Sequence, residues 1–157
     1  MSNDKLEEQI VLVTGASRGI GKSIATNLGK LGAKVVGTAT SEQGASNITA
    51  YLKEAGIEGQ GCVLNVSDPE SVASSVKTVS ELYGAITVLV NNAGITRDNL
   101  LLRMSQTEWD DVISTNLTSV YRLSKAVLRG MMKSRKGRII SIASVVGLSG
   151  NPGQSNY

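Results

Sequence analysis

The sequence predicts an α/β fold in which one doubly wound parallel sheet carries helices on both faces. Short runs of valine, isoleucine and leucine alternate with longer segments whose apolar residues recur at helical spacing. A glycine-rich turn, residues 14–21, directly follows the first apolar run. Strands that alternate with helices pair in parallel through right-handed crossovers, and a doubly wound sheet follows from this alternation.

Five short runs are the expected strands of this sheet. They lie at residues 10–13, 34–37, 61–65, 87–91 and 138–142. Three helices are expected between the first four strands. The first covers residues 20–32 and the second covers residues 41–56, with a serine as its cap and a glycine as its stop. The third begins at Ser67 or Asp68, because Pro69 suits the first turn of a helix.

The longest expected helix covers residues 106–133. Ser105 and Glu108 form a capping-box pattern at its start. Its apolar stripe comprises Trp109, Val112, Ile113, Val120, Leu123 and Val127. Asn116 lies on the same stripe. A buried amide needs hydrogen-bond partners, and these could belong to the protein backbone, to water or to a ligand. A structural role and a ligand contact are therefore both open. Residues 144–157, with their glycines and proline, are expected to form a shaped loop.

The turn between the first strand and the first helix is a candidate phosphate site. It reads Thr-Gly-Ala-Ser-Arg-Gly-Ile-Gly at residues 14–21. Such a turn leaves the first N–H groups of the helix, and the positive end of its dipole, free for an anion. The glycines allow a sharp turn, the approach of a pyrophosphate to the backbone and close packing of the helix on the strand. An ordinary strand-to-helix turn is the alternative.

Three further polar motifs lie at the ends of predicted strands. Asn65 and Val66 lie at the end of the third, Asn-Asn-Ala-Gly at residues 91–94 lies at the end of the fourth, and Ser144 follows the fifth. Ligands of a doubly wound sheet bind beyond the carboxyl ends of its strands. Each motif alone is compatible with turn chemistry, but their common placement predicts one ligand site.

Composition and charge restrict the class of protein. The chain has 157 residues, a formal net charge of +3, one cysteine and no histidine. With neither an apolar signal segment nor a membrane-spanning run, a cytoplasmic protein is expected. Residues 97–138 hold nine Lys or Arg against four acidic residues, but aromatic residues are too few for a base-stacking platform, which argues against nucleic acid. A solvated helix face is the other interpretation of these charges.

Together these motifs resemble those of the short-chain dehydrogenase/reductase family. The resemblance rests on the glycine turn, the Asn-Asn-Ala-Gly run, Asn116, Ser144 and Tyr157. Within that family, the runs at residues 90–101 and 137–147 are similar to those of bacterial reductases of 3-oxoacyl-acyl carrier protein. The likeness extends from about residue 6 to the end of the chain. It implies NADPH-dependent reduction of a 3-oxoacyl thioester in fatty acid biosynthesis.

The resemblance implies roles for particular residues. Tyr157 donates a proton to the substrate carbonyl, Ser144 hydrogen-bonds the same oxygen, and Asn116 holds a water in a proton relay. The implied cofactor-binding residues are Gly15, Ala16, Ser17, Arg18, Gly19, Ile20, Gly21, Thr40, Asn65, Val66, Asn92, Ala93, Gly94 and Tyr157. No metal is expected, and the family implies a homo-oligomer, commonly a tetramer that pairs through the long helix.

The residues after the second predicted strand bear on the choice of cofactor. NAD-binding sites usually place an acidic residue there to hold the ribose 2′-hydroxyl, whereas residues 37–41 contain none and the first acid is Glu42. Thr40 offers a hydroxyl, and Arg18 in the glycine turn offers a cation for a 2′-phosphate. NADP(H) is therefore favoured, with a solvated loop charge as the alternative reading of Arg18.

The basic stretch near the end of the long helix is a candidate surface for an acidic acyl carrier protein. It comprises Arg129, Lys133, Arg135, Lys136 and Arg138. A coenzyme A thioester or another ketone is the alternative substrate. A non-catalytic NADP(H)-binding subunit or sensor is the alternative of another class, although such a protein does not require Asn116, Ser144 and Tyr157.

The sequence stops at Tyr157. Members of the family place a lysine four residues after this tyrosine, followed by a helix and the last strands. Residues 1–157 are therefore expected to be a single NADP-binding domain of Rossmann type that is truncated before its last strands and its substrate-covering segment. A polypeptide of this length is expected to lack reductase activity.

Overall fold

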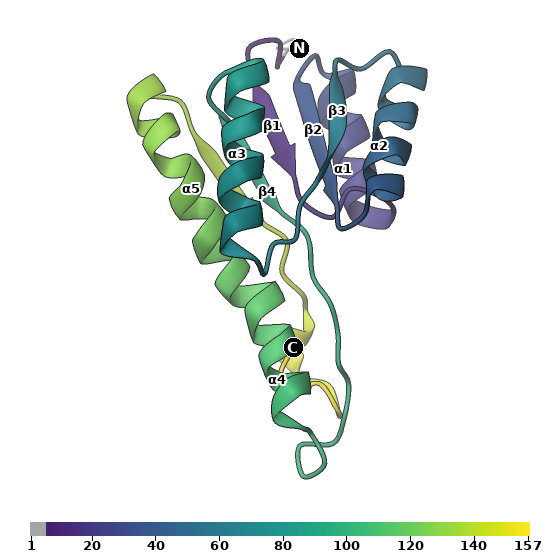
Figure 1. Cartoon of the computed structure of the whole chain (residues 1–157). Coiled ribbons are helices and arrows are strands. Elements are labelled where there is room, and N and C mark those ends of the chain that lie inside the picture. The colour runs from purple at the N-terminus through teal and green to yellow at the C-terminus, as the bar shows by residue number, and fades with distance from the viewer. Residues whose placement is uncertain (1–5) are drawn as a thin grey trace.

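The computed structural model describes residues 6–157 and contains the predicted doubly wound parallel sheet (Figure 1). The strands are β1 (Ile10–Val13), β2 (Lys34–Ala39), β3 (Gly59–Val63), β4 (Val88–Asn91) and β5 (Arg138–Ser141). They are arranged in the order β3-β2-β1-β4-β5. The chain therefore builds outward from β1 to β3 and then returns to the other side of β1. This reversal places a switch point at the carboxyl end of β1.

Helices cover both faces of the sheet, as predicted. They are α1 (Gly19–Lys30), α2 (Glu42–Glu54), α3 (Pro69–Tyr83), α4 (Gln106–Val112), the π-helical turn η1 (Ile113–Thr118), α5 (Ser119–Ser134) and α6 (Val146–Ser149). Helices α1 and α2 pack on one face, and α3 and α5 pack on the other (Figure 1).

Successive residues of β1 belong to two different cores. Val11 and Val13 pack with Ile48 of α2 on one face. Leu12 packs with Val79 of α3 on the opposite face. Because β1 is covered on both faces, its apolar residues form a continuous run rather than an alternating one.

The predicted capping residues begin three of the helices. Ser41 caps α2, and Asp68 rather than Ser67 caps α3. The capping box at the start of α4 is complete. Ser105 Oγ accepts the Glu108 N–H at 3.2 Å, and the Glu108 carboxylate accepts the Ser105 N–H at 2.7 Å.

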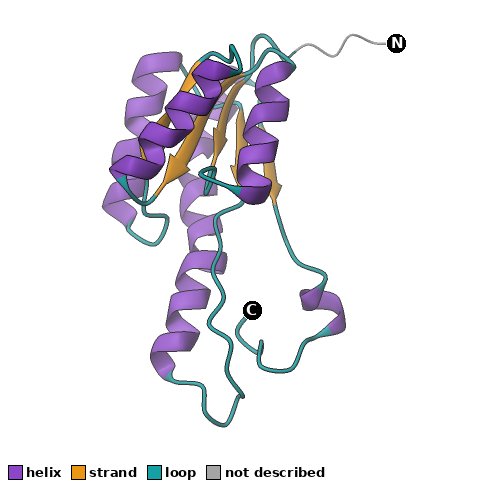
Figure 2. Cartoon of the chain, turned by 90° about the vertical axis from the view of Figure 1, so that its right-hand side faces the viewer, coloured by secondary structure: helices purple, strands orange, loops and turns teal. Residues whose placement is uncertain are grey.

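The helix predicted over residues 106–133 is present as one continuous helical segment from Gln106 to Ser134, but its middle turn is π-helical rather than α-helical. The turn η1 separates α4 from α5, and within it the Ser119 N–H donates to the Ser114 carbonyl, five residues earlier. This wider turn changes which faces of the two helices are aligned, and α4 lies beyond the carboxyl edge of the sheet (Figures 1 and 2). Trp109, predicted on the buried stripe, is therefore 39% exposed, whereas Leu123 of α5 is buried.

The third strand begins and ends two residues earlier than predicted. A Cβ at Gly59 would lie 1.8 Å from the Val35 carbonyl oxygen, and a Cβ at Gly61 would lie 1.9 Å from the Ala45 carbonyl oxygen. The first and third residues of the strand are therefore glycines, which allow the backbones of β2 and α2 to approach closely. The pattern of apolar residues does not indicate this close approach of backbones, so it did not predict the start of the strand.

The segment after β5 also differs from the predicted loop. It contains the short helix α6, next to a turn in which Ser144 Oγ accepts the Val146 N–H at 3.2 Å. The strand β5 is an edge of the sheet, and its residues are exposed. Among residues 6–157, no helix is both long enough and apolar enough to cross a membrane.

Candidate active site

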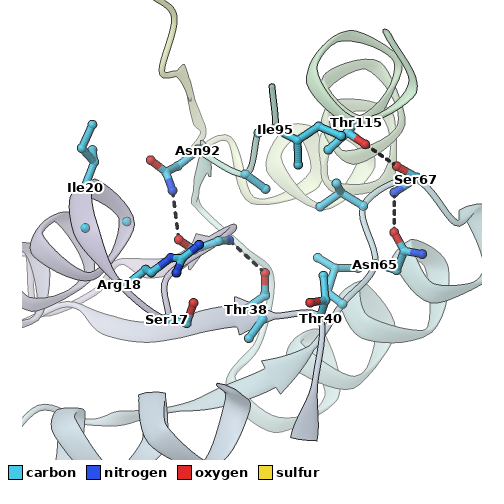
Figure 3. Close-up of a pocket in the computed structure, with 18 residues that line it drawn as sticks. Ser17, Arg18, Ile20, Thr38, Thr40, Asn65, Ser67, Asn92, Ile95 and Thr115 are labelled. Atoms are coloured by element: carbon cyan, nitrogen blue, oxygen red, sulfur yellow. Dashed lines mark hydrogen bonds between the residues drawn. The ribbon is translucent and has the colours of Figure 1, made fainter. Parts of the chain in front are cut away.

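A cleft of about 480 Å³ lies beyond the carboxyl ends of β1 to β4 (Figure 3). The predicted cofactor residues that line it are Gly15, Ser17, Arg18, Gly19, Ile20, Gly21, Thr40, Asn65, Val66, Asn92, Ala93 and Gly94. Figure 3 shows Arg18 and Ile20 of the glycine turn on one side and Asn65 and Ser67 on the other. Ala16 and Tyr157, which were predicted with them, are outside this lining.

The glycine turn requires glycine for two separate reasons. Gly15 has a φ of +65°, a left-handed conformation that strains other residues. A Cβ at Gly21 would lie 2.2 Å from the Gly15 carbonyl oxygen and 2.5 Å from Asn92 Nδ2. Position 21 therefore allows α1 to begin directly against the turn and against the end of β4.

The amino terminus of α1 offers unpaired N–H groups to the cleft. Arg18, the residue before the helix, makes no side-chain cap, and the first turn carries no acidic residue. Within residues 6–157, the N–H groups of Ser17 and Arg18 donate to no other group. These N–H groups and the positive end of the helix dipole form a site for an anion.

The lining of the cleft carries positive charge. Arg18 is its charged residue, and no carboxylate occurs among the described residues that line it. Thr40, directly after β2, lies where an acidic residue would exclude a 2′-phosphate. The charge of the cleft lining therefore suits an anionic ligand.

A buried hydrogen-bond cluster ties the glycine turn to the end of β4. Thr14 Oγ1 accepts the N–H groups of Asn92 at 3.0 Å and Ala93 at 2.9 Å. In return, Asn92 Nδ2 donates to the carbonyls of Thr14 at 2.9 Å and Gly15 at 3.1 Å. The Asn-Asn-Ala-Gly motif thus fixes the position of the turn as well as lining the cleft.

Asn116 lies in the π-helical turn η1 and is half-buried. Its Nδ2 donates to the Ile95 carbonyl at 2.8 Å, and its Oδ1 accepts the Ile95 N–H at 2.9 Å. The predicted need of this amide for partners is met by the backbone. Each amide atom has hydrogen-bonding capacity beyond these two bonds, so a further contact with water or a ligand is compatible with this geometry.

Tyr157 follows a segment that is docked against the connection between β4 and α4. The Asn99 N–H donates to the Gly153 carbonyl at 2.9 Å. Asn156, which is 5% exposed, donates from Nδ2 to the carbonyls of Arg97 at 3.0 Å and Glu108 at 3.1 Å. These bonds hold the backbone on the amino-terminal side of Tyr157, whose own side chain is 43% exposed.

A single connection, residues 92–99, therefore contacts three predicted parts of the site. It bonds to the glycine turn through Asn92, to Asn116 through Ile95 and to the segment before Tyr157 through Asn99. Within residues 6–157, no hydrogen bond joins Asn116, Ser144 and Tyr157 directly to one another. The segments that carry them, which are η1, the stretch after β5 and the end of the chain, lie beyond the carboxyl ends of the strands (Figures 1 and 2).

The sequence matches a known family along nearly the whole chain. A family model described as short chain dehydrogenase matches residues 9–157. The chain belongs to the short-chain dehydrogenase family.

Curated relatives within the family share one name, 3-oxoacyl-[acyl-carrier-protein] reductase FabG. This short-chain dehydrogenase is 60% identical over 152 residues to the one from Vibrio cholerae serotype O1 and 62% identical over 152 residues to the one from Vibrio harveyi. It is 60% identical over 151 residues to the one from Escherichia coli strain K12. The alignments cover 96% to 97% of this chain but 61% of each relative, so the chain spans 61% of their length.

Several lining residues of this short-chain dehydrogenase were not predicted from sequence. They are Thr38, Ala39, Leu64, Ser67, Ile95 and Thr115. Four of these directly adjoin a predicted motif, so a wider window around each motif would have found them. Thr115 directly adjoins the predicted site residue Asn116 and belongs to the π-helical turn η1. Among residues 6–157, no group of three or more His, Cys, Asp or Glu residues is placed to hold a metal ion.

Proposed function

We propose that this chain is the cofactor-binding part of an NADPH-dependent reductase that converts 3-oxoacyl-acyl carrier protein to 3-hydroxyacyl-acyl carrier protein in fatty acid biosynthesis. The observation that carries the proposal is residues 92–99, which bond both to the glycine turn and to the segment before Tyr157. One element would thereby position both the cofactor and the proton donor. The names of the relatives support this choice of substrate.

The lining residues and the charge of the cleft support a nicotinamide dinucleotide phosphate as its ligand. The glycine turn would hold the pyrophosphate, because a side chain at position 21 is excluded and the N–H groups of Ser17 and Arg18, just before α1, are unpaired within the described chain. Arg18, Ser17 and Thr40 would hold the 2′-phosphate, and Asn65 and Val66 would flank the adenine half. When bound, the cofactor supplies the hydride.

The choice of NADPH over NADH can be tested by equilibrium binding. We expect the unsubstituted protein to bind NADPH more tightly than NADH. Arg18→Met should weaken NADPH binding about tenfold, because a charge-assisted hydrogen bond to the phosphate is lost, and should leave NADH binding unchanged. Lys30→Met, at the far end of α1, is the matched control. A clear preference of the unsubstituted protein for NADH would refute the assignment.

The residues of this chain account for the proton that carbonyl reduction needs. As a hydride reaches the carbonyl carbon, the Tyr157 hydroxyl would give its proton to the carbonyl oxygen, which becomes the product hydroxyl. Ser144 Oγ accepts the Val146 N–H, so its own proton is free to stabilise the charge on that oxygen. Asn116 would hold the water through which the tyrosine recovers a proton.

Tyr157→Phe in the complete protein tests the reaction. We expect kcat for a 3-oxoacyl thioester to fall at least about 100-fold, because a general acid is removed, while the dissociation constant of NADPH is unchanged. Tyr121→Phe, on the exposed face of α5, is the control. If the unsubstituted protein binds NADPH but reduces no ketone, the non-catalytic subunit or sensor is supported instead.

The basic residues Arg129, Lys133, Arg135 and Lys136 would steer the carrier rather than touch the reacting carbonyl. They lie toward the end of α5 and in the connection before β5, at the end of the sheet opposite the cleft (Figure 1). In the complete protein, Lys133→Glu with Arg135→Glu should raise KM for the carrier-linked substrate and leave KM for a small ketoester or a coenzyme A thioester unchanged. The same reversals at Lys30 and Lys53 are the control, and equal effects on all substrates would refute steering.

A further inference from the structure

Tyr51 is bonded to the glycine turn although the two lie far apart in sequence. It is on α2, is half-buried and packs against the core that α1 and α2 share. Its hydroxyl donates to the Ala16 carbonyl at 2.9 Å. Ala16 is fully buried, and neither Ala16 nor Tyr51 lines the cleft. The bond is therefore made on the side of the turn that faces away from the cleft.

The bond from Tyr51 completes a two-sided attachment of Ala16. The Ala16 N–H donates to the Thr38 carbonyl of β2 at 2.8 Å, while the Ala16 carbonyl accepts from α2. The following residues, Ser17 and Arg18, are exposed and donate no backbone hydrogen bond within the described chain. The turn is thus held by backbone hydrogen bonds up to Ala16, and the N–H groups of Ser17 and Arg18 are free before α1 begins at Gly19.

This attachment determines where the first free N–H group points. A trans peptide unit is planar, so the Ser17 N–H is directed opposite to the Ala16 carbonyl. A carbonyl held toward α2 therefore directs the Ser17 N–H away from Tyr51, and Ser17 lines the cleft. Fixing this one peptide plane orients the start of the anion site before any ligand arrives.

Two further features keep the Tyr51 hydroxyl in place as a donor. Lys22 Nζ, from the first turns of α1, lies 4.8 Å from the centre of the Tyr51 ring, so the ring is held by α1 as well as by α2. Burial raises the pKa of Tyr51 to about 12, and the hydroxyl keeps its proton at neutral and moderately alkaline pH.

We infer that Tyr51 is a positioning residue for the phosphates of the dinucleotide, acting through the Ala16 carbonyl. This inference rests on the proposed binding of NADP(H). Without the hydrogen bond, the peptide unit between residues 16 and 17 has more orientations in the free protein, and binding must select one of them. The affinity for phosphate then falls because the site is less preorganised.

The test is Tyr51→Phe, with Tyr83→Phe as the matched control. Tyr83 is also half-buried, but it lies at the end of α3, outside the cleft. We expect Tyr51→Phe to weaken NADPH and adenosine 2′,5′-bisphosphate alike by about fivefold, as for the loss of one neutral hydrogen bond, and Tyr83→Phe to change neither. Amide hydrogen exchange of residues 16–18 in the unliganded protein should be faster in Tyr51→Phe alone.

Two results separate this inference from the function on which it rests. If the unsubstituted protein binds NADPH and Tyr51→Phe binds it equally well, the inference is overturned and the proposed cofactor stands. If the unsubstituted protein binds neither ligand, both are overturned. A lower unfolding temperature in Tyr51→Phe with unchanged affinity and unchanged exchange at residues 16–18 would show a structural role only, and would also overturn the inference.

Discussion

At the scale of single residues, the site depends on backbone atoms that approach one another closely. Gly21 lies where the Gly15 carbonyl and Asn92 Nδ2 leave no room for a Cβ. The neighbouring Thr14 is buried and satisfies two N–H groups of the β4 end with one hydroxyl oxygen. The shape of the cleft therefore depends on a small number of positions at which even an added methyl group would disturb the packing of the turn against β4.

Gly21→Ala should damage both stability and binding. The new methyl group meets a backbone oxygen that cannot rotate away, so the free energy of unfolding should fall by about 2 kcal/mol, and NADPH binding should weaken as the turn shifts. Urea denaturation and cofactor titration measure the two effects. Gly130→Ala in α5 is the control, because its Cβ would lie 3.5 Å from Ala85 Cβ, an ordinary contact. If Gly21→Ala left both the free energy of unfolding and NADPH binding unchanged, the close approach of position 21 to the Gly15 carbonyl would be contradicted.

At the scale of elements, the capping box and the π-helical turn have different consequences. The box begins α4 in the region beyond the sheet edge, where few contacts with the core are available. Hydrogen bonds from the Ser105 N–H, the Ser105 hydroxyl and the Asn99 amide lower the pKa of Glu108 below its ordinary value of 4.5. The ionised Glu108 carboxylate is thus the form that stabilises the start of α4. The turn η1 has a different consequence, because it places Asn116 where its amide bonds to the Ile95 backbone.

Glu108→Gln should reduce the acid sensitivity of the fold. A lowered pKa in the folded state means that the stabilising contribution is present above about pH 4.5 and is lost as the pH falls through the lowered pKa. The free energy of unfolding should therefore decrease less in Glu108→Gln than in the unsubstituted protein between about pH 6 and about pH 3. Glu54→Gln, at the end of α2 and outside any capping box, is the control. If the free energy of unfolding fell equally with pH in Glu108→Gln and in the unsubstituted protein, the lowered pKa of Glu108 would be contradicted.

At the scale of the whole molecule, α5 carries an apolar stripe on its outer side. Tyr121, Leu128 and Met132 are 61%, 47% and 70% exposed, and their spacing of seven and four residues places them on one helical face. Exposed apolar surface of this extent is typical of an interaction site. We propose that this stripe joins copies of the chain into the homo-oligomer, a tetramer, that the family resemblance implies.

Tyr121→Glu combined with Leu128→Glu tests the oligomer. Burying two carboxylates without partners is costly, so the double variant should shift toward monomer in size-exclusion chromatography with light scattering, while its circular dichroism stays native. Leu82→Glu, on α3 and 59% exposed, is the control for an added charge elsewhere. If the double variant keeps the parent mass, the stripe is not the interface.

The sequence by itself determined the sheet, the helices on both faces, the capping residues and most of the lining of the cleft. These features follow from local signals: apolar runs, helical periodicity, capping side chains, and glycines at the end of β1. Tertiary structure alone decided the bounds of β3, the π-helical turn η1 within the long helix, the pairing of Asn116 with Ile95 and the bond from Tyr51 to Ala16. Each of these is a contact between segments far apart in the chain or a departure from regular helical geometry, and neither leaves a periodic pattern in the sequence.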